Sequence, residues 1–173
     1  MQAIETVTVG SGGAASITFS SIPDTFTDLK LVCSIRSSRT AVVDGLLVKP
    51  NNSGSNFSYR RLYGSGSSAV AATGSTAELA LINSADNTSN TFGNAAIYIP
   101  NYAGSQNKTF SADSVTENNA TSAFPSFYAG LWSDTSAITS LVLSSATGNN
   151  FVEHSTATLY GILAGSDGTT TVT

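Results

Sequence analysis

Residues 155–163 read "STATLYGIL", and this stretch has the features of a closing β-strand. It is rich in Thr, Leu, Ile and Tyr, has one Gly and no Pro, and is therefore strongly strand-forming. Alternate side chains of a strand lie on opposite faces, which gives two sets here: Ala157, Leu159, Gly161 and Leu163 on one face, and Thr156, Thr158, Tyr160 and Ile162 on the other. Both faces can be packed, so the strand suits the middle of a sheet or a sheet whose outer face meets another subunit.

The same kind of pattern repeats along the whole chain. Short apolar or alternating runs are separated by clusters of Gly, Asn, Ser and Asp, and no window keeps the apolar spacing of a helix. The predicted strands cover 3–9, 15–20, 29–36, 45–50, 57–64, 77–82, 93–100, 107–117, 127–133, 138–144 and 155–163. One helical turn is expected within 118–126. These features predict an all-β fold, an antiparallel β-sandwich in the form of a jelly roll, with about 8 to 11 strands.

Length and composition limit the classes of protein to consider. The 173 residues suffice for one core, so we expect a single domain over 1–173 with short arms at 1–14 and 164–173. Charged residues make up only 10% of the chain and the net charge is −4, which speaks against nucleic-acid binding. Residues 1–13, "MQAIETVTVGSGG", do not resemble a secretory signal, and no apolar run is long enough to span a membrane. The single cysteine, Cys33, is expected to be buried and inert and indicates synthesis in a reducing cytoplasm.

Residue types that support catalysis are few and poorly placed. The only histidine, His154, lies in a predicted loop, and no G-x-S-x-G motif accompanies it. Asp113 and Glu117 share one face of a predicted strand, but their Cα atoms are about 13 Å apart, which is long for a carboxylate pair. One Cys and one His cannot build a structural zinc site, and the loop 86–90, "DNTSN", lacks the Gly and Glu of a calcium loop. The sequence therefore predicts a protein without enzymatic activity, cofactor or metal ion.

The segment 57–64, "FSYRRLYG", is the most promising binding surface. Aromatic and arginine side chains together are favoured at interface hot spots, and aromatic rings also stack on sugars. The candidate interface residues are Phe57, Tyr59, Arg61 and Tyr63, to which we add Tyr160 from the last strand. Three interpretations stay open: a subunit interface, an ordinary mixture of core and surface, and a glycan contact.

Several stretches resemble a family of virion structural proteins of tailed bacteriophages. The most specific are "IPNYAGS" (99–105), "FSADSVTENN" (110–119) and "STATLYGI" (155–162), and the resemblance extends over about 15–163. It implies a β-sandwich or jelly-roll module on the particle exterior, often a trimer, of the kind used in tail fibres or head decoration. The family signatures have no known catalytic role, so no active site carries over.

The sequence and the resemblance together lead to one main hypothesis and two alternatives. The main hypothesis is a homotrimeric capsid decoration or cement protein, made in the host bacterial cytoplasm, that binds the major capsid protein on the virion exterior. The first alternative is a receptor-binding tail fibre or adhesin module that contacts host surface glycans. The second, a polysaccharide-degrading enzyme, has the least support, because the carboxylates are poorly placed.

Overall fold

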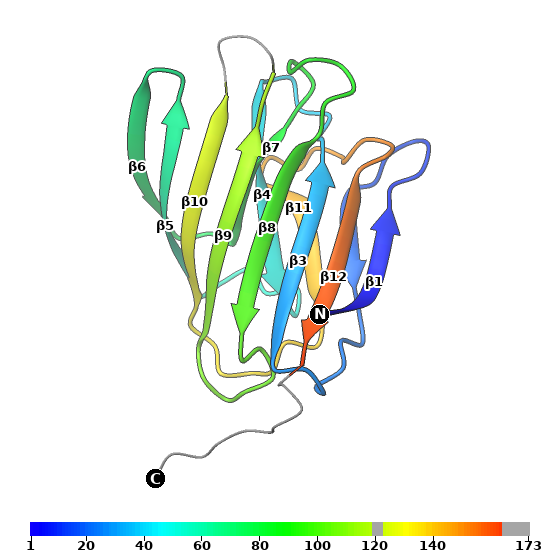
Figure 1. Ribbon diagram of the computed structural model, residues 1–173, viewed down its shortest axis with the longest axis vertical. Helices are drawn as coiled ribbons and strands as arrows, with labels where there is room; N and C mark the ends of the chain where they lie inside the picture. The colour runs from blue at the N-terminus through cyan, green and yellow to red at the C-terminus, as the bar shows by residue number, and fades with distance from the viewer. Residues whose placement is uncertain (119–122, 164–173) are drawn as a thin grey trace.

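The chain folds into two antiparallel β-sheets packed face to face (Figure 1). The computed structural model describes residues 1–118 and 123–163, and these contain twelve strands and no helix. The larger sheet has eight strands in the order β1 (Gln2–Thr8), β12 (Thr156–Ile162), β3 (Asp28–Ile35), β8 (Gly93–Pro100), β9 (Lys108–Thr116), β10 (Phe124–Trp132), β5 (Phe57–Ser65) and β6 (Ser68–Gly74). The smaller sheet has four strands in the order β2 (Ser16–Phe19), β11 (Leu141–Ser145), β4 (Val43–Pro50) and β7 (Glu78–Asn83). The predicted all-β sandwich is confirmed, and its finer assignment as a jelly roll stays a prediction.

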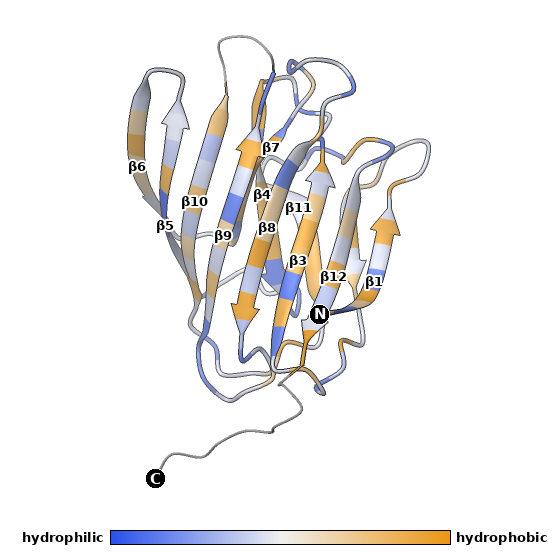
Figure 2. Cartoon of the chain, viewed as in Figure 1, coloured by the Kyte–Doolittle hydropathy of each residue, from blue (hydrophilic) through white to orange (hydrophobic). Residues whose placement is uncertain are grey.

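The core lies between the two sheets and follows from the alternation in the sequence. In β3, Leu29, Leu31, Cys33 and Ile35 are all buried, as predicted. Burial raises the pKa of the Cys33 thiol to about 12, because the thiolate would lose its hydration. Figure 2 shows the resulting alternation of apolar and polar positions along the strands of the larger sheet.

The predicted closing strand at 155–163 corresponds to β12, which has a neighbour on each side. It pairs with β1 along one edge and with β3 along the other. Ala157 and Leu159 point into the core, whereas Thr158 and Tyr160 are only partly covered on the outer face. The strand therefore has one buried face and one face that remains available for contacts.

Some boundaries differ from the sequence prediction. Residues 68–74 form β6, which the sequence did not predict, because Ala-rich segments have low strand propensity and only pairing with β5 holds them extended. β10 begins at Phe124 rather than at 127, so the predicted helical turn does not reach into this strand. The rest of that turn includes 119–122, which lie outside the described residues. Within the expected arm 1–14, Gln2–Thr8 form β1, and the arm 164–173 lies outside the described residues.

Candidate functional site on the eight-stranded sheet

The outward face of the larger sheet is a broad surface made of side chains in register. One row across all eight strands contains Thr6, Thr158, Val32, Ala96, Asp113, Phe127, Leu62 and Ala71. The next row contains Ala3, Tyr160, Lys30, Tyr98, Ser111, Ala129, Arg60 and Thr73. Only three of these sixteen side chains carry a charge. We call this surface the outer face.

The most exposed large apolar side chains of the outer face are direct neighbours. Phe127 in β10 lies opposite Leu62 in β5, and they are 63% and 52% exposed. Val115 on β9 is also exposed. Large apolar side chains that remain next to one another in water are typical of a surface that contacts a partner.

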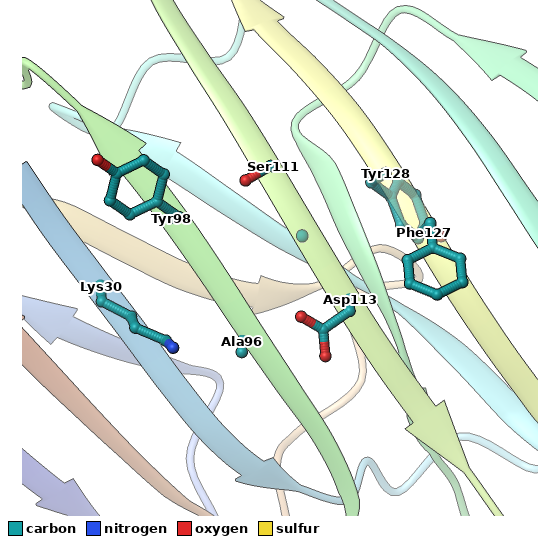
Figure 3. Close-up of a pocket in the computed structure, with 8 residues that line it drawn as sticks. Lys30, Ala96, Tyr98, Ser111, Asp113, Phe127 and Tyr128 are labelled. Carbon is teal, nitrogen blue, oxygen red and sulfur yellow. The ribbon is translucent and has the colours of Figure 1, made fainter.

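A shallow depression of about 260 Å³ lies beside this apolar pair (Figure 3). Its lining includes Lys30, Ala96, Tyr98, Ser111, Asp113 and Phe127, from strands β3, β8, β9 and β10. The hollow exists because Ala96 and Ser111 are small, whereas the longer side chains around them stand up from the sheet. Two aromatic rings, two hydroxyls, an ammonium and a carboxylate thus surround one depression.

Tyr98 is held in place from the end of the neighbouring strand. Its hydroxyl donates to Asp28 Oδ2 at 2.8 Å, and Asp28 Oδ1 accepts from the backbone N–H of Asn101 at 2.9 Å. The hydrogen bond to Asp28 raises the pKa of Tyr98, with smaller contributions from burial and from the Asp28 charge. The ring therefore remains neutral and fixed at one side of the depression.

The two charged groups of the depression are available to a ligand. In the described part of the chain, neither Lys30 nor Asp113 forms a hydrogen bond or an ion pair through its side chain. An ammonium donates and a carboxylate accepts, so together they can satisfy neighbouring hydroxyl groups of a bound molecule. The arrangement suits recognition of a polar ring that also stacks on an aromatic side chain.

The predicted interface residues of β5 lie on the opposite side of the sheet. Phe57, Tyr59, Arg61 and Tyr63 share one face, as predicted, and that face points toward the smaller sheet. Phe57 stacks on Trp132, with ring centroids 6.2 Å apart. Only Tyr160, from β12, belongs to the outer face, where it lies opposite Lys30.

Arg61 is the centre of a partly buried polar cluster on the inner face. Its Nη1 donates to Glu78 Oε1 at 2.5 Å and to the Tyr128 hydroxyl at 3.1 Å, and that hydroxyl donates to Glu78 Oε1 at 3.0 Å. The guanidinium also lies 4.8 Å from the centre of the Tyr63 ring. Burial, followed by the Glu78 charge, raises the pKa of Tyr128. These contacts tie β5 and β10 to β7, so they account for Arg61, Tyr63 and Tyr128 as structural groups.

The residues considered for catalysis are not brought together. Asp113 lines the depression on the outer face, and Glu117 follows the end of β9. His154 lies in the loop before β12 and lines a different depression, together with Arg36 and Phe92. Among the described residues, no hydrogen bond reaches the His154 imidazole, so no base–nucleophile pair is formed there.

The loop considered for calcium is organised by an arginine. Arg36, which follows β3 directly, is 8% exposed. It donates to four backbone carbonyl oxygens of the loop, those of Ala85, Asn87, Thr88 and Thr91, at 2.6–3.0 Å. Its guanidinium thus supplies the positive charge around which the carbonyls converge. Within the described residues no group of three or more metal-ligating side chains occurs.

The sequence interpretation missed Lys30, Tyr98, Leu62 and Phe127 as functional candidates. Phe127 lies on the opposite face of its strand from Tyr128 and Trp132, so alternation alone could have suggested that it is exposed. Both faces of that strand carry apolar residues, however, so the sequence did not show which face is buried. The depression itself depends on the lateral register of four strands, which the sequence does not encode locally.

In the described residues no helix is long and apolar enough to cross a lipid bilayer. Comparison with known proteins gives no match to a family model, to a curated protein or to a solved structure.

Proposed function

We propose that this chain is a non-enzymatic structural protein that docks onto a larger assembly through its outer face. The resemblance of its sequence to virion proteins of tailed bacteriophages suggests which assembly. In this proposal it is a decoration or cement protein on the virion exterior, bound to the major capsid protein.

The observation that carries the docking proposal is the exposed pair Phe127 and Leu62 on a broad surface with few charges. A protein that stabilises a shell needs a wide contact area, and a sheet face in register offers one without rearrangement. Because hydroxyl and apolar groups dominate the outer face, binding relies on burial and neutral hydrogen bonds. Contacts of this kind lose little strength when salt screens charges.

Reconstitution of phage heads that lack this protein tests the proposal. The purified chain should bind such heads and raise their resistance to heat, with an affinity that changes little between about 50 and 200 mM salt. Phe127→Asp should weaken binding at least about tenfold, because it places a charge in the apolar contact. Thr18→Asp is the matched control, since Thr18 is exposed on β2 of the smaller sheet, on the opposite side of the molecule from the outer face. The docking proposal would be refuted if the heads did not bind the native chain, or if they bound the two variants equally well.

The depression supports a second candidate function, recognition of host glycans by an adhesin module. Tyr98 and Phe127 supply aromatic faces, and Lys30 and Asp113 supply a donor and an acceptor for sugar hydroxyls. Chemical shift changes at Tyr98 and Asp113 on titration with host surface oligosaccharides, abolished by Asp113→Asn, would favour this function. Labelling of the protein at the tail tip, with bare heads, would reject the decoration role.

The remaining parts of the sequence hypothesis stay predictions. The homotrimer is tested by the mass of the protein in solution. The absence of catalysis is tested by assaying the purified protein on host capsule and lipopolysaccharide. Depolymerisation that is lost in His154→Ala, Asp113→Ala or Glu117→Ala would overturn the non-enzymatic assignment.

A further inference from the structure

The edge strand β6 is free along one side. Within residues 1–118 and 123–163 it ends the larger sheet, pairs only with β5 and has no strand beyond it (Figure 1). Among the described residues, no hydrogen bond outside the β5 pairing reaches 68–74. A row of backbone N–H and C=O groups is therefore open to another strand.

The other three sheet edges have features that discourage pairing. β1 has an irregular register between Ala3 and Glu5, and Glu5 adds an exposed charge. β2 is only four residues long. The Leu81 N–H of β7 is already bonded to Ser114 Oγ of β9 at 3.1 Å. β6 has no such protection, because its seven residues, "SAVAATG", carry no charge and no proline and keep one continuous register with β5.

The hairpin geometry shows which groups of β6 are open. Ser65 and Ser68 close a two-residue turn, and the pairs continue as Tyr63 with Val70 and Arg61 with Ala72. In such a hairpin the closing pair and every second pair after it exchange hydrogen bonds. The three residues between these pairs, Ala69, Ala71 and Thr73, therefore direct both backbone groups away from β5.

We infer that β6 pairs antiparallel with β6 of a second copy of this chain, about a two-fold axis at Ala71. In this register Ala71 lies opposite its own symmetry mate and Ala69 lies opposite Thr73 of the other copy. All six open groups of each strand then form hydrogen bonds, because the three outward residues are centred on Ala71. The two larger sheets become one continuous sheet across the axis.

The side chains and charges of β6 fit this second copy. Small residues face one another throughout, so no side chain clashes and no like charges meet. The nearest charge on the outer face is Arg60, opposite Thr73 on β5. In the paired state the two copies of Arg60 are about 20 Å apart, beyond the range of effective repulsion at physiological salt. The inference does not depend on the proposed virion function.

Light scattering with charge variants tests the pairing. The native chain should have twice the 17.7 kDa mass of one chain, whereas the homotrimer expected from the sequence would have three times that mass. Ala71→Lys places two like charges opposite each other on the axis and should weaken the dimer at least about tenfold. Thr109→Lys adds the same charge to the same face three strands away and should leave the dimer intact. A monomer or trimer mass for the native chain at its highest soluble concentration would overturn the inference.

Disulfide trapping tests the register and does not rely on the lysine variant. The only native cysteine, Cys33, is buried, so a new thiol on β6 is the only accessible one. Ala71→Cys should crosslink rapidly, since the paired Cα atoms lie about 5.5 Å apart, within disulfide range. Ala69→Cys should not crosslink, because the two copies of residue 69 are about 14 Å apart, whereas Ala69→Cys combined with Thr73→Cys should. Equal crosslinking of Ala71→Cys and Ala69→Cys, or none in the first, would refute this register.

Discussion

Replacement of Arg36 tests how the loop that follows β7 is held. The side chain crosses from β3 to this loop and donates to the carbonyl oxygens of Ala85, Asn87, Thr88 and Thr91. Burial lowers the pKa of Arg36, but an arginine side chain starts so far above neutral pH that the group is charged at any ordinary pH. Arg36→Ala removes one donor group from four acceptors at once.

The expected loss can be worked out from the exposure of those acceptors. A hydrogen bond to a charged group makes a net contribution of about 1.5–3 kcal/mol to the free energy of unfolding, and a buried acceptor that loses its partner costs a similar amount. Ala85 and Thr88 are exposed, so water replaces the guanidinium there, whereas the bond to the Asn87 carbonyl is buried. We therefore expect Arg36→Ala to lower the free energy of unfolding by about 2–4 kcal/mol, well below the sum of four bonds. Arg36→Lys should lower the free energy of unfolding by about 1–3 kcal/mol, because an ammonium has three donors and lacks the planar fork of a guanidinium.

Urea unfolding followed by the fluorescence of Trp132 measures these changes, since this only tryptophan is buried. Arg60→Ala is the control: Arg60 is exposed, forms no ion pair within the described residues, and its loss should cost less than about 0.5 kcal/mol. If Arg36→Lys were as stable as the native protein, charge alone would explain the role of Arg36. If Arg36→Ala cost no more than Arg60→Ala, the loop would not depend on the Arg36 side chain, and the reasoning would fail.

Two further predictions concern the core and a close approach between strands. The pKa of the Cys33 thiol is raised from 9.0 to about 12 in the fold, so its contribution to stability is present below pH 9 and is lost as the pH rises toward 12. Cys33→Ala should therefore reduce the loss of stability at alkaline pH, measured by unfolding at a series of pH values. An unchanged pH profile would contradict this assignment. A Cβ at Gly74 would overlap the Tyr59 ring, so Gly74→Ala should cost about 1–3 kcal/mol in thermal or urea unfolding, whereas Gly54→Ala, which meets open space, should stay within about 0.5 kcal/mol. Equal stability of the two glycine variants would show that the ring moves aside without cost.

The fold class could be predicted because strand alternation is a local property of the sequence. The buried set Leu29, Leu31, Cys33 and Ile35 is readable from its spacing alone, and burial in the structure confirms it. β6 could not be predicted in this way, since Ala and Ser carry little information about burial. Its extended form depends on the turn at Gly66, whose φ of 67° allows the chain to reverse and pair with β5.

The candidate site was less accessible to prediction, because it is defined by lateral register. The sequence correctly placed Tyr59, Arg61 and Tyr63 on one face of their strand but could not indicate which face meets the smaller sheet. Alternation has a two-fold ambiguity that only a packed partner resolves. Lys30 and Phe127 are almost a hundred positions apart in the chain. They line the same depression only because the sheet order brings β3 and β10 to either side of β8 and β9.

The free β6 edge and the apolar pair Leu62 and Phe127 lie at the same end of the larger sheet. Ala71, Leu62 and Phe127 are consecutive members of one row, so the open backbone and the exposed apolar side chains are continuous. A charge-poor protein that left both in water would carry an aggregation site, which natural proteins block with charges, bulges or prolines. β6 has none of these, so its edge remains open to pairing with another strand. Two-fold pairing would cover the edge and place two outer faces side by side on one sheet, which would double the contact area offered to a larger assembly and add avidity to each docking event.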